Sequence, residues 1–148
     1  MNSWDRLKVI EKVSNAADVH GSSNPQQQKQ LIFSCKKAKE QEIFFGLFSF
    51  FYDSSLQTNQ SERQELAGTI LYSVLPSSPL TLDASVYAAA KYWDLSVEEL
   101  PWYWCKIFGK STVMNFITEL IPDCKDDELK NSLETMLFWC RNYEKNNT

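Results

Sequence analysis

The residues of this chain that are best suited to chemistry are one histidine and two groups of carboxylates. His20 is the only histidine among 148 residues, and it lies at the edge of the polar segment 21–25. Nucleophilic catalysis of the Ser–His or Cys–His type needs a histidine base held beside its nucleophile. No G-x-S-x-G turn occurs in the sequence. We therefore expect His20 to lie on the surface, and we predict no catalytic residue.

The carboxylates could serve as an acid–base pair or hold a divalent cation. Glu98 and Glu99 form one group. The other group consists of Asp123, Asp126, Asp127 and Glu128. Both groups stand where helices are expected to begin, and carboxylates stabilise the positive end of a helix dipole. The second group also lacks the glycine and the spacing of an EF-hand loop. Helix capping is therefore the favoured interpretation, and an enzyme with a carboxylate-bound metal is an alternative.

Glycine and cysteine spacing gives no sign of a cofactor or metal site. The four glycines are too far apart for a G-x-G-x-x-G loop or a P-loop. The cysteines show no C-x-x-C pair and no neighbouring histidine, so neither zinc binding nor thioredoxin-type chemistry is indicated. We expect buried, reduced thiols at Cys35, Cys105, Cys124 and Cys140. The sequence therefore predicts no cofactor, no metal and no enzyme activity.

Composition predicts one ordered domain that spans residues 1–148. Hydrophobic residues make up 43% of the chain and aromatic residues 14%, with only 4 glycines and 5 prolines, which is typical of a folded globular protein. The polar tail, 144–148, is expected to fray. The net charge is −4, which argues against a general affinity for nucleic acid. Residues 61–148 carry 13 acidic against 8 basic side chains, so the C-terminal half holds the acidity.

We expect a cytoplasmic protein without a membrane anchor. The N-terminus shows no basic region followed by an apolar run, as a signal peptide would. The longest apolar run, 43–52, has ten residues, about half of the roughly 20 that a membrane-spanning helix needs.

This apolar run is expected to be a buried helix at the centre of the fold. Its apolar side chains point to nearly all sides of a helix, as in a helix that others surround. A buried strand is the alternative, because phenylalanine also favours strands. We expect a break between this helix and the one before it, in the polar run 36–42.

The other segments show helical periodicity. Ser3 is expected to cap a first helix with Trp4, Leu7, Ile10, Val13 and Ala17 on its apolar face. Capping boxes are predicted at Ser61 with Gln64 and at Ser96 with Glu99. Further helices are expected from about Thr81, Ser111 and the acidic turn 123–128. The fold class is therefore all-α, with about seven helices in an antiparallel array or bundle around the aromatic helix.

A second aromatic group follows Trp93. Consecutive Trp102, Tyr103 and Trp104 cannot all point the same way from a helix, so at least one should reach the surface. Exposed aromatic side chains beside carboxylates are typical of protein interfaces. The alternative is that all three pack in the core, with Tyr103 at its rim.

The run 93–103, Trp-Asp-Leu-Ser-Val-Glu-Glu-Leu-Pro-Trp-Tyr, followed by Phe108-Gly109-Lys110, resembles a segment of small all-α bacterial proteins. These proteins are encoded beside polymorphic or contact-dependent toxins, and several of them are immunity proteins. The resemblance covers roughly 20 of the 148 residues. It implies a protein that acts by binding and carries over no catalytic residue.

The leading hypothesis is therefore a non-enzymatic immunity protein that neutralises a toxin domain through an acidic surface. If the toxin is a nuclease, its basic cleft would attract such a surface. No direct binding to nucleic acid is expected. The alternative is a helical scaffold or regulatory subunit of a larger or self-assembled complex. The predicted partner-binding residues are Asp94, Glu98, Glu99, Trp102, Tyr103, Asp123, Asp126, Asp127 and Glu128.

Overall fold

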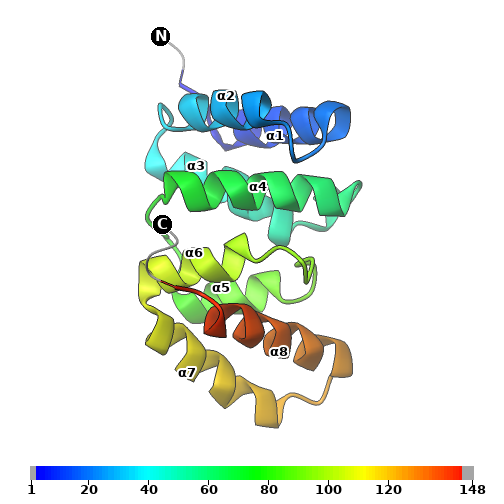
Figure 1. The fold of residues 1–148 in the computed structure, drawn as a ribbon, viewed down its shortest axis with the longest axis vertical. Helices are drawn as coiled ribbons and strands as arrows, with labels where there is room; N and C mark the ends of the chain where they lie inside the picture. The colour runs from blue at the N-terminus through cyan, green and yellow to red at the C-terminus, as the bar shows by residue number, and fades with distance from the viewer. Residues whose placement is uncertain (1–2, 145–148) are drawn as a thin grey trace.

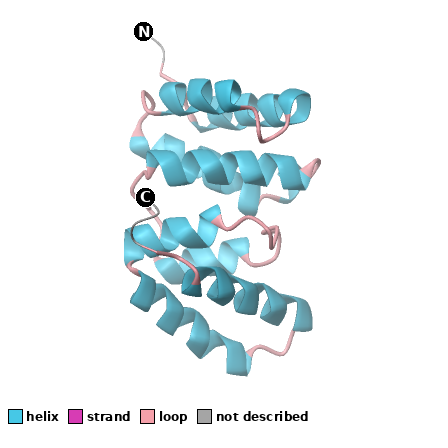
Figure 2. Ribbon diagram, viewed as in Figure 1, coloured by secondary structure: helices cyan, strands magenta, loops and turns pink. Residues whose placement is uncertain are grey.

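A computed structural model describes residues 3–144, and within them the fold is all-helical, without a strand (Figure 2). Eight α-helices occur in this part of the chain, with three short 3-10 helices, so the predicted fold class is confirmed and the predicted number was one too low. The predicted frayed tail lies outside the described residues except for Glu144. The α-helices are α1 (Arg6–His20), α2 (Pro25–Cys35), α3 (Glu40–Phe48), α4 (Gln60–Val74), α5 (Leu82–Ala89), α6 (Glu99–Phe108), α7 (Lys110–Leu120) and α8 (Asp127–Arg141).

The helices form successive pairs that stack on one another from the N-terminus to the C-terminus (Figure 1). Helix α4 packs against α1 and α2 above it, against α3 at the same level, and against α6 below it. Helix α6 in turn packs against α7 and α8. The contact between α4 and α6 therefore joins the two halves of the stack.

The aromatic segment forms the buried centre, as predicted. It is α-helical as far as Phe48 and continues as a 3-10 helix, η1 (Ser49–Phe51). Phe44, Phe48, Phe50 and Phe51 are fully buried, and the rings of Phe44 and Phe48 stack with their centroids 5.1 Å apart. The strand alternative is wrong. The predicted break is confirmed, because α2 ends before the polar run and α3 begins inside it.

The first helix departs from its prediction at its cap and on its apolar face. Asp5, not Ser3, caps α1 and accepts a hydrogen bond from the backbone N–H of Lys8 at 2.8 Å. Leu7, expected in the core, is 71% exposed, and Val9 is fully buried in its place. This rotation follows from packing, because Val9 faces the close approach of α3 at Gly46.

Both predicted capping boxes are wrong, because their side chains bind elsewhere in the fold. Helix α4 begins after Asn59 and helix α6 after Glu98, each without a side-chain cap. The hydroxyls of Ser61 and Ser96 each donate to the carboxylate of Asp94, both at 2.8 Å. Two other helices do have side-chain caps. Thr81 caps α5, and Asp126 caps α8, as capping by the acidic turn 123–128 predicted.

The cysteines follow their prediction within the described residues. Cys35, Cys105 and Cys140 are buried free thiols, and Cys124 is a half-buried one. Burial raises the pKa of Cys35 to about 12. None of the helices within residues 3–144 combines the length and the apolar character that crossing a membrane requires.

Candidate functional site

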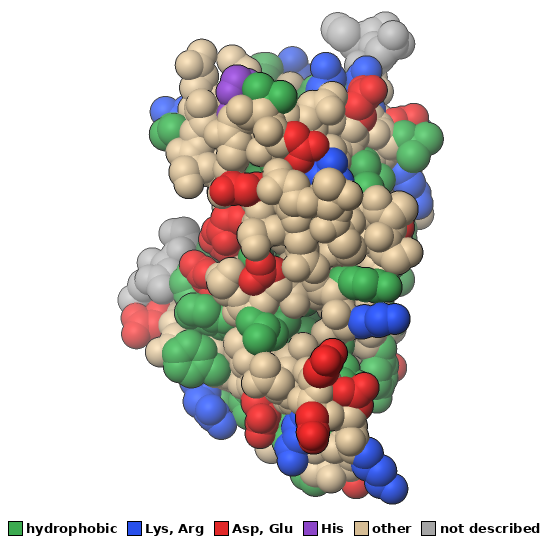
Figure 3. All heavy atoms as spheres, turned by 90° about the vertical axis from the view of Figure 1, so that its right-hand side faces the viewer, with side chains coloured by type: hydrophobic (Ala, Val, Ile, Leu, Met, Phe, Trp, Pro, Cys, Tyr) green, Lys and Arg blue, Asp and Glu red, His purple; other side chains and the backbone are tan. Residues whose placement is uncertain are grey.

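Five carboxylates gather where the two halves of the stack meet, and we call this surface the acid face. Two come from α4, one from the connection between α5 and α6, and two from the start of α6. All five side chains are half-buried. Acidic side chains are concentrated at mid-height along the left-hand edge of Figure 3, on the side of α4 and α6. The acid face consists of Glu62, Glu65, Asp94, Glu98 and Glu99.

The close packing of α4 on α6 brings these carboxylates together. At Gly68, one turn beyond Glu65 on α4, a Cβ atom would lie 3.0 Å from Cγ1 of Val97 and 3.2 Å from Cβ of Glu99. The glycine therefore lets the start of α6 approach the backbone of α4 closely. The result is that the carboxyl of Glu99 is held beside that of Glu65.

The pair Glu65–Glu99 is the strongest electrostatic feature of the acid face. Burial, followed by the negative charge of Glu65, raises the pKa of Glu99 to about 8. Burial, followed by the charge of Glu98, also raises the pKa of Glu65. The Oε1 atom of Glu99 is buried without a hydrogen-bond donor in the described part of the chain. Like charges at short range disfavour ionisation, so the pair retains a proton at neutral pH.

Two other acidic side chains of this face, Glu62 and Asp94, accept hydrogen bonds from neutral donors. Glu62 accepts a hydrogen bond from the backbone N–H of Ser22 at 2.6 Å. Burial disfavours the ionised form of Asp94, but hydrogen bonds from Ser96 and Ser61 outweigh it and lower its pKa. Within residues 3–144, none of the five carboxylates of the acid face forms a salt bridge. The face therefore presents negative charge without a cation to balance it.

A buried glutamine supports the acid face from beneath. Gln64 is 1% exposed, and its amide nitrogen donates to the carbonyl oxygens of Phe50 at 3.0 Å and Tyr92 at 2.7 Å. Its amide oxygen accepts a hydrogen bond from the backbone N–H of Asp94 at 2.6 Å. These bonds fix the connection between α5 and α6 against α4, and so they position the acidic side chains on it.

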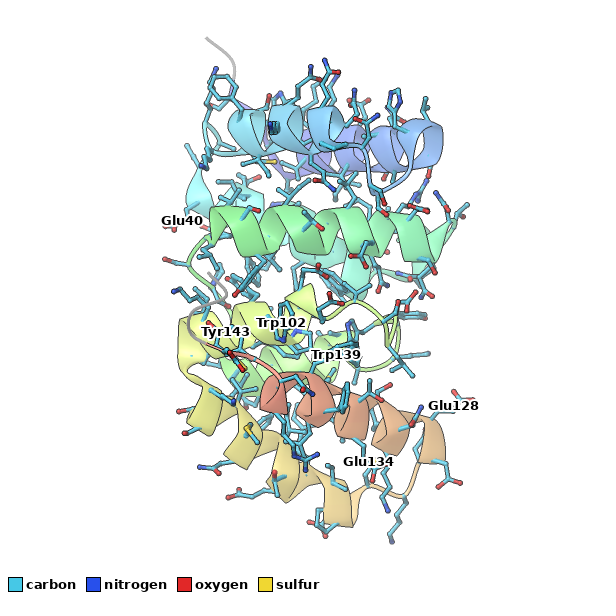
Figure 4. The ribbon with its side chains drawn as sticks, in the orientation of Figure 1. Glu40, Trp102, Glu128, Glu134, Trp139 and Tyr143 are labelled. Atoms are coloured by element: carbon cyan, nitrogen blue, oxygen red, sulfur yellow. The ribbon has the colours of Figure 1, made fainter. Side chains whose placement is uncertain are left out.

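Tryptophan side chains hold the lower edge of the same connection. The indole N–H of Trp102 donates to the carbonyl oxygen of Trp139 at 3.0 Å, and that of Trp139 donates to Leu95 at 2.8 Å. Trp102, Trp139 and Tyr143 lie together between α6 and α8 (Figure 4). Trp102 is half-buried, so it can contribute an aromatic edge beside the acid face.

The sequence suggested that Tyr103 could lie at the rim of the core, but the structure places it elsewhere. It is fully buried, and its hydroxyl donates to the carbonyl oxygen of Pro76 at 2.5 Å. Trp102 occupies the rim position instead, because the start of α6 is rotated to bury Tyr103 and Trp104 together. Tyr103 thus offers no surface to a partner.

The structure divides the predicted binding residues between two regions. Asp94, Glu98, Glu99 and Trp102 belong to the acid face or its edge. The other acidic residues are exposed around the connection between α7 and α8. Figure 4 shows that Glu128, at the start of α8, lies at the opposite end of this helix from Trp139. The second region contains Asp123, Asp126, Asp127 and Glu128.

The histidine lies in a surface hollow between the first two helices, which Ser34 also lines. His20 is exposed at the end of α1, as predicted. It lines a hollow of about 360 Å³ between α1 and α2, and no carboxylate or thiol lines that hollow. Among the residues that the structure describes, no three His, Cys, Asp or Glu side chains are grouped so that they could hold a metal ion.

Sequence reasoning missed Glu62 and Glu65 as members of the acid face. They lie one turn apart on α4, a spacing that puts both on one side of a helix, but nothing in that spacing shows which helix faces them. Only the packing of α6 on α4 supplies the other carboxylates. No protein-family model, curated protein or solved structure matches this chain.

Proposed function

We propose that this protein is a non-enzymatic binding module that docks on a basic protein surface through the acid face. The observation that carries the proposal is the set of five half-buried carboxylates without a salt bridge among the described residues. Solvated surface carboxylates are common, but carboxylates held together in a partly buried position repel one another. A cationic partner would relieve this repulsion.

Arginine and lysine side chains are the natural ligands of such a face. A guanidinium can bind a carboxylate through two parallel hydrogen bonds, and Glu99 has an oxygen atom without a donor. Burying a cation between Glu65 and Glu99 would displace the proton that they share. The half-buried ring of Trp102 at the edge would add contact area of the kind that is enriched in interfaces.

We further propose that the partner is a bacterial toxin domain and that binding neutralises it in the cytoplasm. Support comes from the resemblance of residues 93–110 to immunity proteins, because this segment supplies Asp94, Glu98 and Glu99 to the acid face. A nuclease toxin has a basic substrate cleft, and an acidic face would associate with it quickly through electrostatic steering. The protein would then act by covering the cleft.

The test uses calorimetry to measure binding of the protein that the adjacent gene encodes. The variant Glu62→Gln/Glu98→Gln removes two charges from the acid face. Its control, Glu119→Gln/Glu134→Gln, removes two charges from exposed positions on α7 and α8. We expect the first variant to weaken binding by at least about tenfold, or about 1.4 kcal/mol, and the control to bind like the wild type.

Higher salt should weaken the wild-type complex, because exposed charges are screened. Equal binding by both variants would show that the acid face is not the docking surface. Failure of the wild type to bind the neighbouring domain would overturn the proposed partner.

A further inference from the structure

Charge is distributed very unevenly along the stack of helices. Residues 3–39, which contain α1 and α2, carry 7 basic against 3 acidic side chains. Residues 40–144 carry 7 basic against 16 acidic side chains. Basic side chains are seen at the top of the molecule in Figure 3, over the first helix pair. The protein is therefore positive at its N-terminal end and negative over the remainder.

An aromatic side chain projects from the positive end. Phe33, on α2, is 62% exposed, and the ammonium group of Lys37 lies 4.1 Å from the centroid of its ring. Lys36, the next residue to Lys37, is also exposed. Single exposed apolar side chains are common on protein surfaces, so what distinguishes Phe33 is the ammonium group over its ring and the basic residues beside it. We call Phe33, Lys36 and Lys37 the cationic knob.

A groove with the opposite character lies between α5 and α8, and we call it the acidic groove. It consists of two adjoining hollows of about 190 Å³ and 430 Å³ that share Tyr87, Ala90 and Leu129. Tyr87 is 61% exposed and stands edge-on to the ring of Phe116, with 6.4 Å between centroids. The floor of the acidic groove is apolar, since the fully buried Val86 lies there.

Carboxylates line the same two hollows. They are Asp123 in the smaller one and Asp126 and Glu128 in the larger one. Lys91 is the basic side chain among the lining residues. Residues 110–144, which form the last helix pair and its connections, carry 7 acidic against 4 basic side chains. The groove thus combines an apolar floor with an acidic rim, which is what an aromatic ring with flanking ammonium groups requires.

The cationic knob and the acidic groove have opposite charge, so each is complementary to the other surface and not to a second copy of itself. A symmetric contact between two cationic knobs would bring two positive ends together, and a contact between two acidic grooves would bring two negative ends together. Like charges placed opposite one another cost free energy. A head-to-tail contact pairs opposite charges and also covers Phe33.

We propose that a second copy of this chain inserts its cationic knob into the acidic groove, which gives an open, head-to-tail assembly. A contact of this heterologous kind leaves one free knob and one free groove on every dimer, so it propagates. The assembly is independent of the acid face on α4 and α6, and therefore of the proposed toxin partner.

Analytical ultracentrifugation and light scattering over a range from micromolar to millimolar protein at low ionic strength test the proposal. The wild type should form species that grow with concentration and dissociate at about 1 M salt, where the Debye length is about 3 Å. Phe33→Ser should abolish this growth. Leu7→Ser, which changes a 71%-exposed side chain of the same helix pair, should not.

Charge reversal identifies the two surfaces. Lys36→Glu/Lys37→Glu makes the knob acidic, and Asp123→Lys/Glu128→Lys makes the groove basic. Each variant alone should be monomeric, and an equimolar mixture should associate again, because each variant then offers opposite charge to the other. The matched controls are Lys29→Glu/Lys106→Glu and Glu119→Lys/Glu134→Lys, at exposed positions outside both surfaces, and they should assemble like the wild type.

A wild-type protein that stays monomeric over the whole concentration range at low salt would overturn the proposal. So would a symmetric dimer that does not grow further, or a mixture of the two reversed variants that remains monomeric. Thermal unfolding of each variant, followed by circular dichroism, separates loss of assembly from loss of fold.

Discussion

The amide oxygen of Gln64 accepts a hydrogen bond from the backbone N–H of Asp94 at 2.6 Å, and this bond joins the two halves of the helical stack. Gln64 lies on α4 in the upper half, and Asp94 precedes α6 in the lower half. The carboxylate of Asp94 is then held by the hydroxyls of Ser61 and Ser96. The same contact that orders the domain therefore also builds the acid face.

Replacing Gln64 with leucine should destabilise the protein strongly. The leucine fills a similar volume but leaves the carbonyl oxygens of Phe50 and Tyr92 and the N–H of Asp94 without this partner. Unsatisfied buried polar groups cost about 1–3 kcal/mol each, and such costs are not additive. We expect a loss of about 3 kcal/mol in the free energy of unfolding, measured by urea denaturation. Gln60→Leu removes the hydrogen bonds from the Gln60 amide to Tyr92 and Gln57 and should cost about 1 kcal/mol. An equal loss in both variants would argue against a special role for Gln64 in joining α4 to the segment before α6.

The Glu99 carboxyl should make stability fall as pH rises. Its pKa is about 8 in the folded protein against an ordinary value of 4.5, so between these values the folded state binds more protons than the unfolded state. The free energy of unfolding then decreases from about pH 4.5 to about pH 8 and levels off above that. Glu99→Gln lacks this proton equilibrium, and it should exceed the wild type in stability by about 2 kcal/mol at pH 8, after allowance for solvent screening.

Thermal unfolding of wild type and Glu99→Gln at several pH values checks this difference. The advantage of the variant should shrink as pH falls towards 4.5. Glu119→Gln, on the exposed side of α7, should follow the wild type at every pH. A difference between Glu99→Gln and wild type that does not change with pH would contradict a shared proton at this site.

The ion pair between Arg6 and Glu42 should give a pH dependence of opposite sign. Hydrogen bonds from the side chain and backbone of Arg6 lower the pKa of Glu42 to about 2, and the closest N–O distance is 2.7 Å. The folded state therefore binds fewer protons than the unfolded state between about pH 4.5 and pH 2. The contribution of the pair is present above pH 4.5 and is lost as pH falls to about 2.

Glu42→Gln should consequently be less stable than the wild type at neutral pH and equal to it near pH 2. Chemical denaturation of both proteins across this range measures the convergence. Glu11→Gln affects an exposed pair with Lys8 and should differ little from the wild type, because exposed ion pairs contribute little. Curves for Glu42→Gln and wild type that stay parallel down to pH 2 would rule out this linkage.

A methyl group at Gly46 should disrupt the packing of α3 on α1. A Cβ atom there would lie 2.6 Å from Cβ of Val9, which is fully buried. Overpacking of this kind costs about 1–3 kcal/mol, and we expect Gly46→Ala to lose about 2 kcal/mol in the free energy of unfolding, beyond what its higher helix propensity returns. Gly68→Ala meets longer but still tight contacts, at 3.0 Å from Val97 and 3.2 Å from Glu99, and should lose less, about 1 kcal/mol. Denaturation curves of the two variants, compared side by side, show whether the closer contact governs the outcome.

The periodicity of apolar residues was sufficient to predict most of the helices. Val113 and Ile117 on α7, and Leu133 and Leu137 on α8, are buried as their spacing indicates. The break before the aromatic helix was also predictable, because its polar residues interrupt the apolar pattern. The caps were less predictable. Ser61 and Ser96 have the right spacing for capping boxes, but in the folded chain they donate to Asp94, a partner that local sequence does not show.

The sequence by itself determined an all-helical chain with a buried aromatic centre, because helix periodicity and burial of Phe44 and Phe48 depend on residues close in the chain. Only the tertiary structure decided how the carboxylates are grouped. Glu65 and Glu99 are 34 positions apart, and they meet because α4 and α6 pack closely at Gly68. The sequence predicted Asp94, Glu98 and Glu99 as acidic contacts, but the proton shared with Glu65 arises from burial and from charge at short range. Burial and short-range charge both depend on the distance between α4 and α6, and the spacing of residues along the sequence does not reveal that distance.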